Sequence, residues 1–202
     1  MPTLPAHLLA TLAQLGTLRQ FQAGVMILSE GEPGDAVYLL ERGQVRSFSQ
    51  AISGKEISYN IIQAGQYFGE MALDGGPRSS SVEALTDCEC WVVANAQVLA
   101  YAAQNSEFAL HLLTTAISRA RSATDAARDM ALLDVYSRLA QTLNHEFATN
   151  DGICNLTHAQ LAAKIGASRE MVSKLIKDLV RGGYVASHSR QTMHIKKLPA
   201  RW

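Results

Sequence analysis

The chain has 202 residues, of which 48% are hydrophobic and 18% are charged, a composition typical of a globular protein with one or two domains. Its formal net charge is zero, but the charge is divided unevenly along the chain. Residues 1–133 carry 8 Lys and Arg against 13 Asp and Glu, whereas residues 134–202 carry 10 against 5, which predicts that only the C-terminal part meets a polyanion.

Membrane insertion, disulfides and metal binding are not expected. The sequence has no apolar run near the roughly 18 residues of a membrane span, and its first residues lack the basic start and apolar core of a secretory signal. We therefore expect a cytoplasmic protein without a membrane partner. The three cysteines are an odd number with no nearby histidine to complete a zinc site, so we expect buried or idle thiols and no metal.

Residues 6–16 are predicted to form a short helix. Residues 21–99 are predicted to form short strands that are broken by Gly, Pro, Asp and Asn. This spacing is typical of a β-sandwich or barrel. The main expected strands are residues 25–28, 36–40, 45–48, 56–62 and 88–93.

The most informative stretch is residues 68–82, called the cassette below. Glu70 and Arg78 flank a Gly-Gly-Pro turn at residues 75–77, and three serines follow directly at residues 79–81. Arginine can fork onto a phosphate, backbone N–H groups and hydroxyls can surround the same anion, and a carboxylate can accept from a sugar hydroxyl. The cassette therefore suits a small ligand with one phosphodiester and one ribose hydroxyl, although a surface ion pair beside a tight turn is the alternative.

The cassette closely resembles the phosphate-binding cassette of cyclic-nucleotide-binding domains, in which Gly-Glu, a short apolar helix and Pro-Arg-Ser/Ala recur in this order. Upstream, residues 30–38 and 43–45 look like the glycine-marked turns of the same domain. The resemblance therefore spans roughly residues 15–100 and does not depend on one motif.

A long helix is expected after a short one at residues 96–103. Ser106 can cap it, and Glu107 favours its first turn. Small or apolar residues then recur in alternating steps of four and three, which is a heptad pattern, over a helix of about 28 residues and roughly 40 Å. The helix either packs on its own β domain or forms a two-fold seam with a second copy of the chain. The seam residues are Leu113, Ile117, Ala120, Thr124, Ala127 and Ala131.

A hinge is expected at residues 133–135, between the long helix and the next domain. Residues 135–147 are predicted to be helical, and residues 150–152 to form a turn. After this turn, residues 157–179 have the spacing of a helix-turn-helix, a motif that places its second helix in the major groove of DNA.

Local signals support the helix-turn-helix. Thr157 and Gln160 form a capping box, Gly166 permits the sharp bend, and Ser168 caps the second helix. The outer face of that helix is polar and basic. A merely solvated surface is the alternative, but the turn and the basic charge balance favour double-stranded DNA as the partner. The outward residues are Ser168, Arg169, Glu170, Ser173, Lys174 and Lys177.

Groove chemistry suggests a role for these side chains. Arg169 can fork onto guanine, Glu170 can accept from a cytosine amino group, and Lys174 can reach guanine or a phosphate. Residues 186–197 are expected to form a hairpin that serves as a wing. Further DNA contacts, mostly to phosphates, are expected from Thr157, Lys164, Ser168, Ser173, Lys177, Arg190, Lys196 and Lys197.

Along nearly its whole length the chain resembles the catabolite activator/FNR (CRP/FNR) family of bacterial transcription regulators, and residues 168–174 match the family's recognition-helix motif. The resemblance implies an α+β fold with a cyclic-nucleotide-binding β-roll at residues 1–105, a dimerisation helix at residues 106–133 and a winged helix-turn-helix at residues 134–202. It implies a homodimer on a palindromic operator with half-sites about one helical turn apart, and RNA polymerase as a further partner. A hydrolytic enzyme acting on cyclic nucleotides is a third hypothesis, but the sequence has no His and Asp cluster with metal spacing and no evident nucleophile–base pair, so we expect no enzymatic activity.

The resemblance also implies where an effector binds. Cyclic AMP is the first choice, with cyclic GMP and cyclic di-GMP as alternatives; Ala123, where the activator has a hydroxyl, removes one adenine contact. The ligand would favour one arrangement of the hinge near Asp134, and so one spacing of two recognition helices. The expected effector residues are Gly69 and Glu70 for the ribose, Met71 and Ala72 beside them, Arg78 and Ser79 for the cyclic phosphate, and Arg119 and Thr124 on the long helix.

A competing hypothesis is a ligand-independent DNA-binding regulator of the same family, whose effector pocket is vestigial. In that case Glu70 and Arg78 are expected to pair with each other. Lone histidines such as His7 and His111 are expected to be surface or packing residues rather than haem ligands.

Overall fold

The computed structural model describes residues 3–52, 54, 56–150, 152–187, 193–195 and 198. The chain forms two compact units. The N-terminal unit consists of Met1–Ser49 and Tyr59–Ser122, and the C-terminal unit of Gln50–Ser58 and Ala123–Trp202. Within the described residues, every helix is too short or too polar to cross a bilayer.

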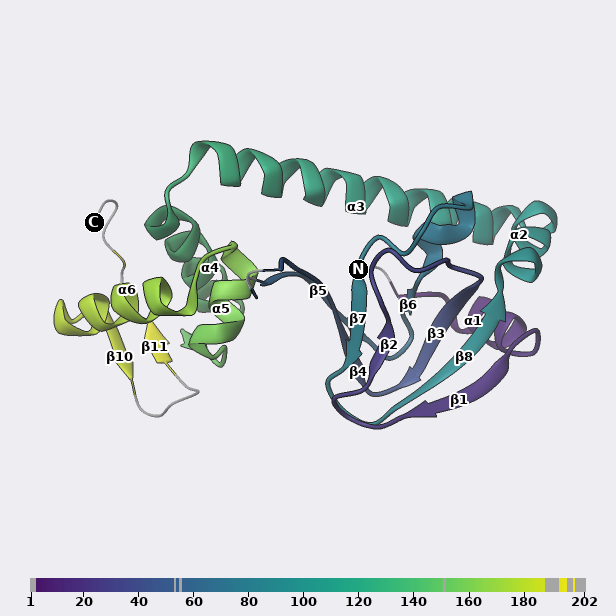
Figure 1. Ribbon diagram of the computed structural model, residues 1–202, viewed down its shortest axis with the longest axis horizontal. Helices are drawn as coiled ribbons and strands as arrows, with labels where there is room; N and C mark the ends of the chain where they lie inside the picture. Colours follow the sequence, from purple (N-terminus) through teal and green to yellow (C-terminus); the bar gives the residue numbers. More distant parts are fainter. Residues whose placement is uncertain are drawn as a thin grey trace. The chain divides into compact units, whose positions relative to one another are not determined.

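The N-terminal unit is built on two four-stranded antiparallel sheets (Figure 1). One has the order β1-β8-β3-β6, with β3 pairing to β8 on one side and to the short β6 on the other. The other has the order β2-β7-β4-β5. The bounds are β1 Thr17–Phe21, β2 Met26–Leu28, β3 Ala36–Arg42, β4 Gln44–Gln50, β5 Glu56–Gln63, β6 Tyr67–Phe68, β7 Ser81–Ala84 and β8 Cys88–Ala94.

Strand β3 shows why this unit needs helices as well as sheets. Its side chains alternate between two apolar faces: Tyr38 and Leu40 belong to the core between the sheets, and Val37 and Leu39 belong to a second core. That second core also contains residues of α1 (Ala6–Ala13), α2 (Asn95–Gln104) and the start of α3. The expected β-sandwich is therefore confirmed, and three helices supply the apolar cover for one of its faces.

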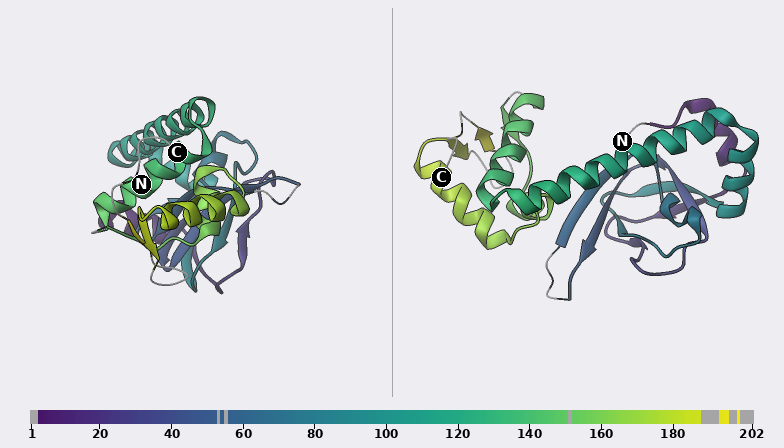
Figure 2. Two further views of the ribbon diagram at one scale, coloured as in Figure 1. Left: turned by 90° about the vertical axis from the view of Figure 1, so that its left-hand side faces the viewer. Right: turned by 90° about the horizontal axis from the view of Figure 1, so that it is seen from above.

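Helix α3 runs from Ser106 to Leu132 as one continuous helix (Figure 2). Its two faces have different environments. Phe108 and Thr115 are buried against the N-terminal unit, whereas Leu113 and Ile117, from the predicted seam, are 56% and 48% exposed. One face of the helix therefore packs on the N-terminal unit, and the two-fold seam with a second copy stays a prediction.

The C-terminal unit combines three helices with a small sheet of order β10-β11-β9. Leu139, Leu161, Val172 and Leu179 lie in its core at 0% exposure. The wing prediction is confirmed for β10 and β11, which pair antiparallel from Val185 opposite Ile195. The bounds are α4 Val135–Thr149, β9 Ile153–Cys154, α5 His158–Ile165, α6 Arg169–Arg181, β10 Val185–Ser187 and β11 Met193–Ile195.

Most expected elements are present with shifted ends. Helix α1 ends at Ala13 rather than at residue 16, because a turn at Gln14 and Leu15 leads directly into β1. The pairing of β9 with β11 was not expected, since two residues between a turn and a helix carry no strand pattern. The wing residues Arg190, Lys196 and Lys197, and Asp151 of the predicted turn, lie outside the described residues.

Candidate functional site

The cassette folds around a short 3₁₀ helix, η1, at Glu70–Asp74. Gly69 and Gly75 bracket it, both with left-handed backbones at φ 83° and 86°. Two features exclude a side chain at Gly69. The left-handed conformation favours glycine, and a Cβ there would lie 2.8 Å from Nη1 of Arg78. The glycine therefore lets the arginine approach the start of η1 directly.

Arg78 is buried at 5% exposure and is held from several sides. Its Nη1 donates to the carbonyl oxygen of Gly69 at 2.8 Å, and its Nη2 lies 3.9 Å from a carboxylate oxygen of Asp35. The guanidinium also lies over the ring of Tyr38, at 5.9 Å from the centroid. A buried cation with so few anionic neighbours is suited to an added anion, because burial without a full counter-charge is unfavourable.

Glu70 pairs with Arg119 of α3. Their side chains are only 12% and 22% exposed, respectively. Burial lowers the pKa of Arg119, and the nearby Tyr67 acts in the opposite direction. The pairing of Glu70 with Arg78 that the ligand-independent hypothesis predicts is not formed: Arg78 contacts Gly69 and Asp35, and Glu70 pairs with Arg119, 49 positions away.

The face of α3 around Arg119 is polar although much of it is covered. His111, Thr115 and Arg119 are spaced by four residues and so share one side of the helix. The ring of His111 lies 5.8 Å from that of Tyr67 in β6, and burial lowers the pKa of His111. Burial also raises the pKa of Tyr67. His111 is thus a packing residue, as expected.

The other expected effector residues differ in how accessible their side chains are. Met71 is 55% exposed, and the hydroxyl of Ser79 donates to its sulfur at 3.1 Å. Ala72 is buried at 1%, so only its backbone is available there. Thr124 is exposed on the part of α3 that belongs to the C-terminal unit. The structure thus brings Glu70, Arg78 and Arg119 together around η1.

Asn95, the first residue of α2, supports the cassette and was not anticipated. Its Nδ2 donates to the carbonyl oxygens of Gly34 and Ala72, at 3.1 and 3.0 Å. It therefore ties the loop before β3 to η1. No sequence pattern indicates this, because the three residues are 23 to 61 positions apart.

Metal ligands and reactive thiols do not gather in the part of the chain that the structure describes. No group of three or more His, Cys, Asp or Glu residues there could hold a metal ion. Cys88, Cys90 and Cys154 are free and buried. Burial, with a smaller effect of Cys88, raises the pKa of Cys90 to about 12, so its thiolate is scarce at neutral pH.

The predicted capping signals of the helix-turn-helix are confirmed. Thr157 and Gln160 form a complete capping box at the start of α5, and Gly166 ends α5 in the left-handed conformation at φ 65°. The hydroxyl of Ser168 then accepts from the backbone N–H of Met171 and starts α6. The end of α5, the turn at Gly166 and the start of α6 are thus each determined by neighbouring residues, and together they set the direction of α6.

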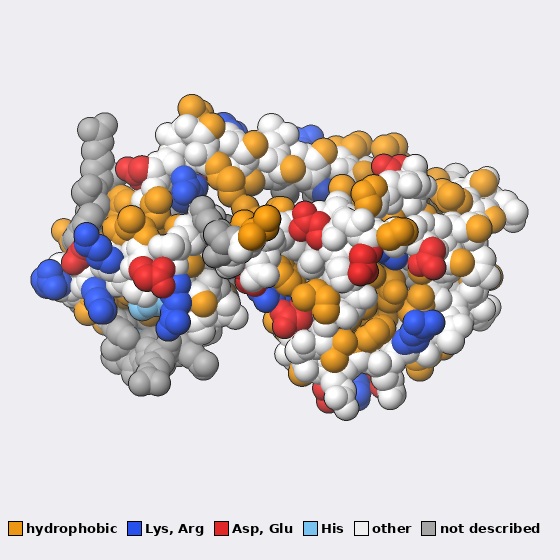
Figure 3. Space-filling model, in the orientation of Figure 1, with side chains coloured by type: hydrophobic (Ala, Val, Ile, Leu, Met, Phe, Trp, Pro, Cys, Tyr) orange, Lys and Arg blue, Asp and Glu red, His pale blue; other side chains and the backbone are white. Residues whose placement is uncertain are grey.

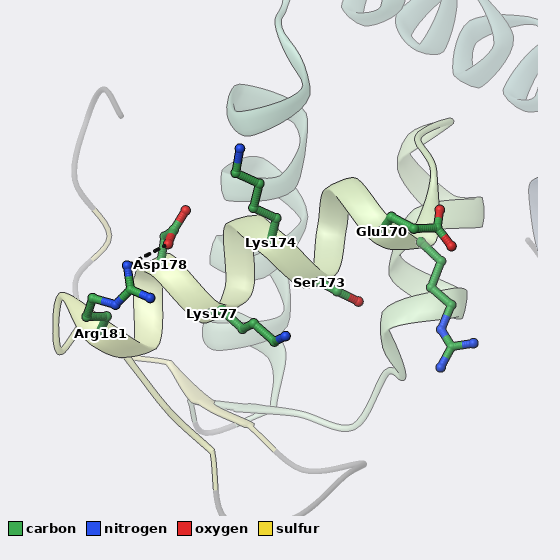
Figure 4. A pocket seen from close by; sticks show the side chains of 7 residues that line it. Glu170, Ser173, Lys174, Lys177, Asp178 and Arg181 are labelled. Carbon is green, nitrogen blue, oxygen red and sulfur yellow. Dashed lines mark hydrogen bonds and ion pairs between the residues drawn. The ribbon is translucent and has the colours of Figure 1, made fainter.

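The outer face of α6 carries the predicted polar set (Figure 4). A shallow hollow there is lined by Arg169, Glu170, Ser173, Lys174, Lys177, Asp178 and Arg181. Val172, Ile176 and Leu179 are buried on the inner face. Asp178 and Arg181 pair with each other, at 3.4 Å, whereas Lys174 and Lys177 extend from the helix (Figure 4). The exposed face is therefore both cationic and rich in hydrogen-bonding groups, as major-groove readers require.

His158 was overlooked in the sequence although it touches this face. Its Nδ1 lies 3.0 Å from the hydroxyl oxygen of Ser173. Burial lowers the pKa of His158, and the charges of Arg169 and Lys177 lower it further. Lys164, expected to bind phosphate, instead pairs with Glu146 of α4 at 3.1 Å.

The hinge between α3 and α4 is held by two side chains. Asp134 accepts from the backbone N–H of Ser137 at 2.7 Å and so caps α4, and this hydrogen bond lowers the pKa of Asp134. Arg138 donates to the carbonyl oxygens of Leu133 and Ile165, at 2.6 and 3.0 Å. The end of α3 is therefore connected through one guanidinium to the end of α5.

Lysines and arginines gather on the visible face of the C-terminal unit, near α6, whereas the visible face of the N-terminal unit shows apolar and acidic patches (Figure 3). The basic excess of the C-terminal part of the sequence is thus visible on the surface of the C-terminal unit. Basic groups beside a helix-turn-helix are the electrostatic signature of a nucleic-acid interface.

Comparisons with known proteins agree with this geometry. Residues 18–105 match the cyclic nucleotide-binding domain family, and residues 137–200 match the Crp-like helix-turn-helix domain family. The chain is 28% identical to a CRP-like cAMP-activated global transcriptional regulator of Mycobacterium tuberculosis, over 94% of this chain and 88% of that protein. It is 31% identical to the cyclic AMP receptor protein of Thermus thermophilus, over 83% and 78%.

A solved structure shows the same fold at lower identity. The c-di-GMP responsive global regulator CLP of Xanthomonas campestris superposes with a TM-score of 0.83 at 20% identity, covering 96% of this chain and 100% of that one.

Proposed function

Because the chain belongs to the CRP/FNR family of bacterial transcription regulators, which are DNA-binding proteins and not enzymes, we propose that it is a homodimeric regulator controlled by a cyclic nucleotide. Cyclic AMP is the first candidate, in line with the names of the curated relatives. The observation that supports this most strongly is the burial of Arg78. Its side chain lies beside the start of η1 at 5% exposure, and its Nη2 is 3.9 Å from a carboxylate oxygen of Asp35.

In the proposed pocket, a cationic side chain binds the phosphate of the ligand and an anionic side chain binds its ribose. Arg78 and Ser79 hold the cyclic phosphate, because a guanidinium and a hydroxyl are strong donors to phosphate oxygens. Glu70, with Gly69 at the start of η1, accepts from the ribose hydroxyl. Met71 and the backbone of Ala72 border the sugar.

Helix α3 supplies the remaining contacts in this proposal. Arg119 already holds Glu70, and Thr124 faces the nucleobase from the seam of a second copy. Two apolar seam residues, Leu113 and Ile117, are about half exposed, so a second copy would remove them from water and contribute favourably. Cyclic GMP and cyclic di-GMP are the alternative effectors, the latter because a structural neighbour is named for it.

On the DNA side, we assign base reading to Arg169, Glu170 and Lys174, and phosphate contacts to Ser168, Ser173 and Lys177. Thr157 is committed to its capping box, so it supports the interface through α5. A dimer would place two such helices on a palindromic site about one helical turn apart. We place the regulator in the cytoplasm, where it meets DNA and RNA polymerase.

The proposed switch acts on the hinge. A nucleotide that contacts η1 and α3 together stabilises one arrangement of α3, and Arg138 carries a change at Leu133 to Ile165 at the end of α5. Effector binding then shifts the population of DNA-competent dimers by its differential affinity for the two arrangements.

A ligand-independent regulator of the same family, with a vestigial effector pocket, is the second candidate. It predicts that Glu70 and Arg78 pair with each other, whereas Glu70 pairs with Arg119 and Arg78 donates to the carbonyl oxygen of Gly69.

Titration calorimetry with cyclic AMP, cyclic GMP and cyclic di-GMP, followed by DNA-binding titrations with and without the nucleotide that binds, tests the proposal. We expect one nucleotide to bind and to raise affinity for a selected duplex. If none of the three nucleotides binds and the protein without nucleotide binds DNA fully, the second candidate is supported instead. A monomer at every concentration would refute the dimer.

A further inference from the structure

We propose that DNA binding by this chain is proton-linked through His158, whose protonated ring fixes the hydroxyl of Ser173 as a hydrogen-bond donor toward the DNA. The inference rests on the DNA-binding role and adds a pH-dependent positioning residue to it. It starts from one contact, the 3.0 Å separation of His158 Nδ1 and Ser173 Oγ.

The contact joins the two helices of the helix-turn-helix. His158 is the first residue of α5, directly after the capping Thr157, and Ser173 lies on the outer face of α6 among the residues that line the hollow there. Both side chains are half-buried. The imidazole therefore supports a hydroxyl in the middle of the proposed reading face.

A neutral His158 ring leaves the direction of this hydrogen bond to its tautomer, whereas the protonated ring sets it. A serine hydroxyl has one proton to donate. Beside a neutral ring that accepts at Nδ1, Ser173 donates inward and presents only lone pairs to a ligand. An imidazolium has a donor on both nitrogens, so its Nδ1–H donates to Ser173, and the hydroxyl proton is free to bind a phosphate oxygen or a base acceptor.

The surroundings disfavour the charged ring in the free protein, burial most of all. Among the described residues, the charged groups that act on His158 are Arg169 and Lys177, both on α6 and both cationic. On α5 itself, Lys164 is at the opposite end of the helix and pairs with Glu146 of α4. The positive end of the α5 dipole, where His158 sits, further disfavours a charged ring.

DNA reverses this electrostatic balance. Phosphates that approach Arg169, Lys177 and the start of α5 bring negative charge to the same side of His158, and an opposite charge nearby favours the protonated ring. The pKa of His158 is therefore higher in the complex than in the free protein. Between these two values DNA binding takes up a proton, so affinity rises as the pH falls, by at most tenfold per pH unit for each subunit.

The test measures affinity for one duplex, selected from a random library with the wild-type protein, by fluorescence anisotropy from about pH 8 to about pH 6, a range that brackets the ordinary histidine pKa. We expect wild-type affinity to rise at least threefold more than that of His158→Gln over this range, since glutamine can bond Ser173 but cannot titrate. His145→Gln, at an exposed position of α4, is the matched control and should keep the wild-type slope.

A second measurement on the wild-type protein covers the case in which His158→Gln is poorly folded. The NMR titration of the His158 ring should move to higher pH when the duplex is added. An unchanged titration, or equal pH slopes for wild type and His158→Gln, would overturn the inference while leaving DNA binding intact. Failure to bind any duplex at low salt at any pH would instead refute the DNA-binding role.

Discussion

The carboxylate of Glu70 and the guanidinium of Arg119 form an ion pair that joins η1 to α3. The two residues are 49 positions apart in the chain, and both side chains are mostly shielded from water. The pair links the cassette, where an effector is proposed to bind, to the helix whose far end leads to the hinge.

Removing either member of this pair should destabilise the N-terminal unit. Arg119→Met leaves a shielded carboxylate without its partner, so we expect a loss of about 1–3 kcal/mol in the free energy of unfolding. Glu70→Gln/Arg119→Met should lose less than the sum of the two single variants. Urea unfolding measures all three. Arg128→Met, which breaks an exposed pair with Asp125, is the control and should change the free energy of unfolding by less than about 0.5 kcal/mol. If the losses of the two single variants at residues 70 and 119 simply added in the double variant, the two side chains would not be energetically coupled.

Arg78→Ala should abolish cyclic-nucleotide binding. A charged hydrogen bond to phosphate contributes about 1.5–3 kcal/mol, and two such bonds from one fork would correspond to a loss of about 100-fold or more in affinity. Arg78→Lys should recover only part of it, since an ammonium cannot fork. Titration calorimetry gives the affinities, and circular dichroism verifies the fold. Arg42→Ala, at an exposed arginine that pairs with Glu89, should bind as the wild type does; unchanged affinity in Arg78→Ala would remove Arg78 from the pocket.

The stability of the N-terminal unit should fall in mild acid because of His111. Burial lowers its pKa in the folded state, and its Nε2 is buried without a hydrogen-bond partner among the described atoms. The unfolded state therefore binds the proton more readily. This contribution is fully present above the unfolded-state pKa of about 6.5 and is lost as the pH falls toward the lower folded-state value. Unfolding titrations at several pH values should show a shallower acid loss in His111→Gln than in the wild type; equal acid losses would contradict the prediction.

Thr157→Ala should weaken the C-terminal unit by about 1 kcal/mol, because the capping box at the start of α5 is removed. Thr157→Ser keeps the hydroxyl oxygen that accepts from the Gln160 N–H and should retain most of the stability. Thermal unfolding compares the two variants. Equal losses in both would mean that the threonine methyl group, rather than the cap, is what matters.

The residues of α6 should separate into two kinds of DNA contact. Arg169→Ala is expected to lose about 1–3 kcal/mol of discrimination at a single base pair, as a bidentate guanine contact would. Lys177→Ala should weaken binding to all duplexes alike and reduce the salt slope by about 0.9 per subunit, because one phosphate contact is lost. Binding to single-base variants of a selected duplex at several salt concentrations distinguishes the two. Arg181→Ala, whose side chain pairs with Asp178, is a useful comparison for an arginine that is already engaged.

Local patterns in the sequence were sufficient for most secondary structure. The capping box at Thr157, the bend at Gly166 and the start of α6 at Ser168 each depend on residues within a few positions of one another, and all three are present as expected. The long helix starts where expected, but the predicted cap is wrong: Ser106 is its first residue, and the side chain of Asn105 accepts from the backbone N–H of Phe108 at 2.9 Å. Short strands such as β6 and β9 escaped notice, because two residues carry no usable periodicity.

Pairings across the fold could not be anticipated in the same way. The ligand-independent hypothesis predicted Arg78 beside Glu70, but Arg78 donates to Gly69, since the positive-φ glycine leaves room for the guanidinium. Asn95 reaches Gly34 and Ala72 only because β8 delivers α2 to the cassette. His158 meets Ser173 only because the bend at Gly166 brings two helices together.

The amino-acid sequence by itself therefore determined the order of elements, the caps of α5 and α6, the amphipathic faces and the chemistry of the cassette and of α6, because these follow from residue type and short-range spacing. Only the tertiary structure decided which charged and polar groups meet: Arg119 with Glu70, and His158 with Ser173. Such meetings depend on how distant segments pack, and side chains with several possible partners settle on the one that burial and geometry leave within reach.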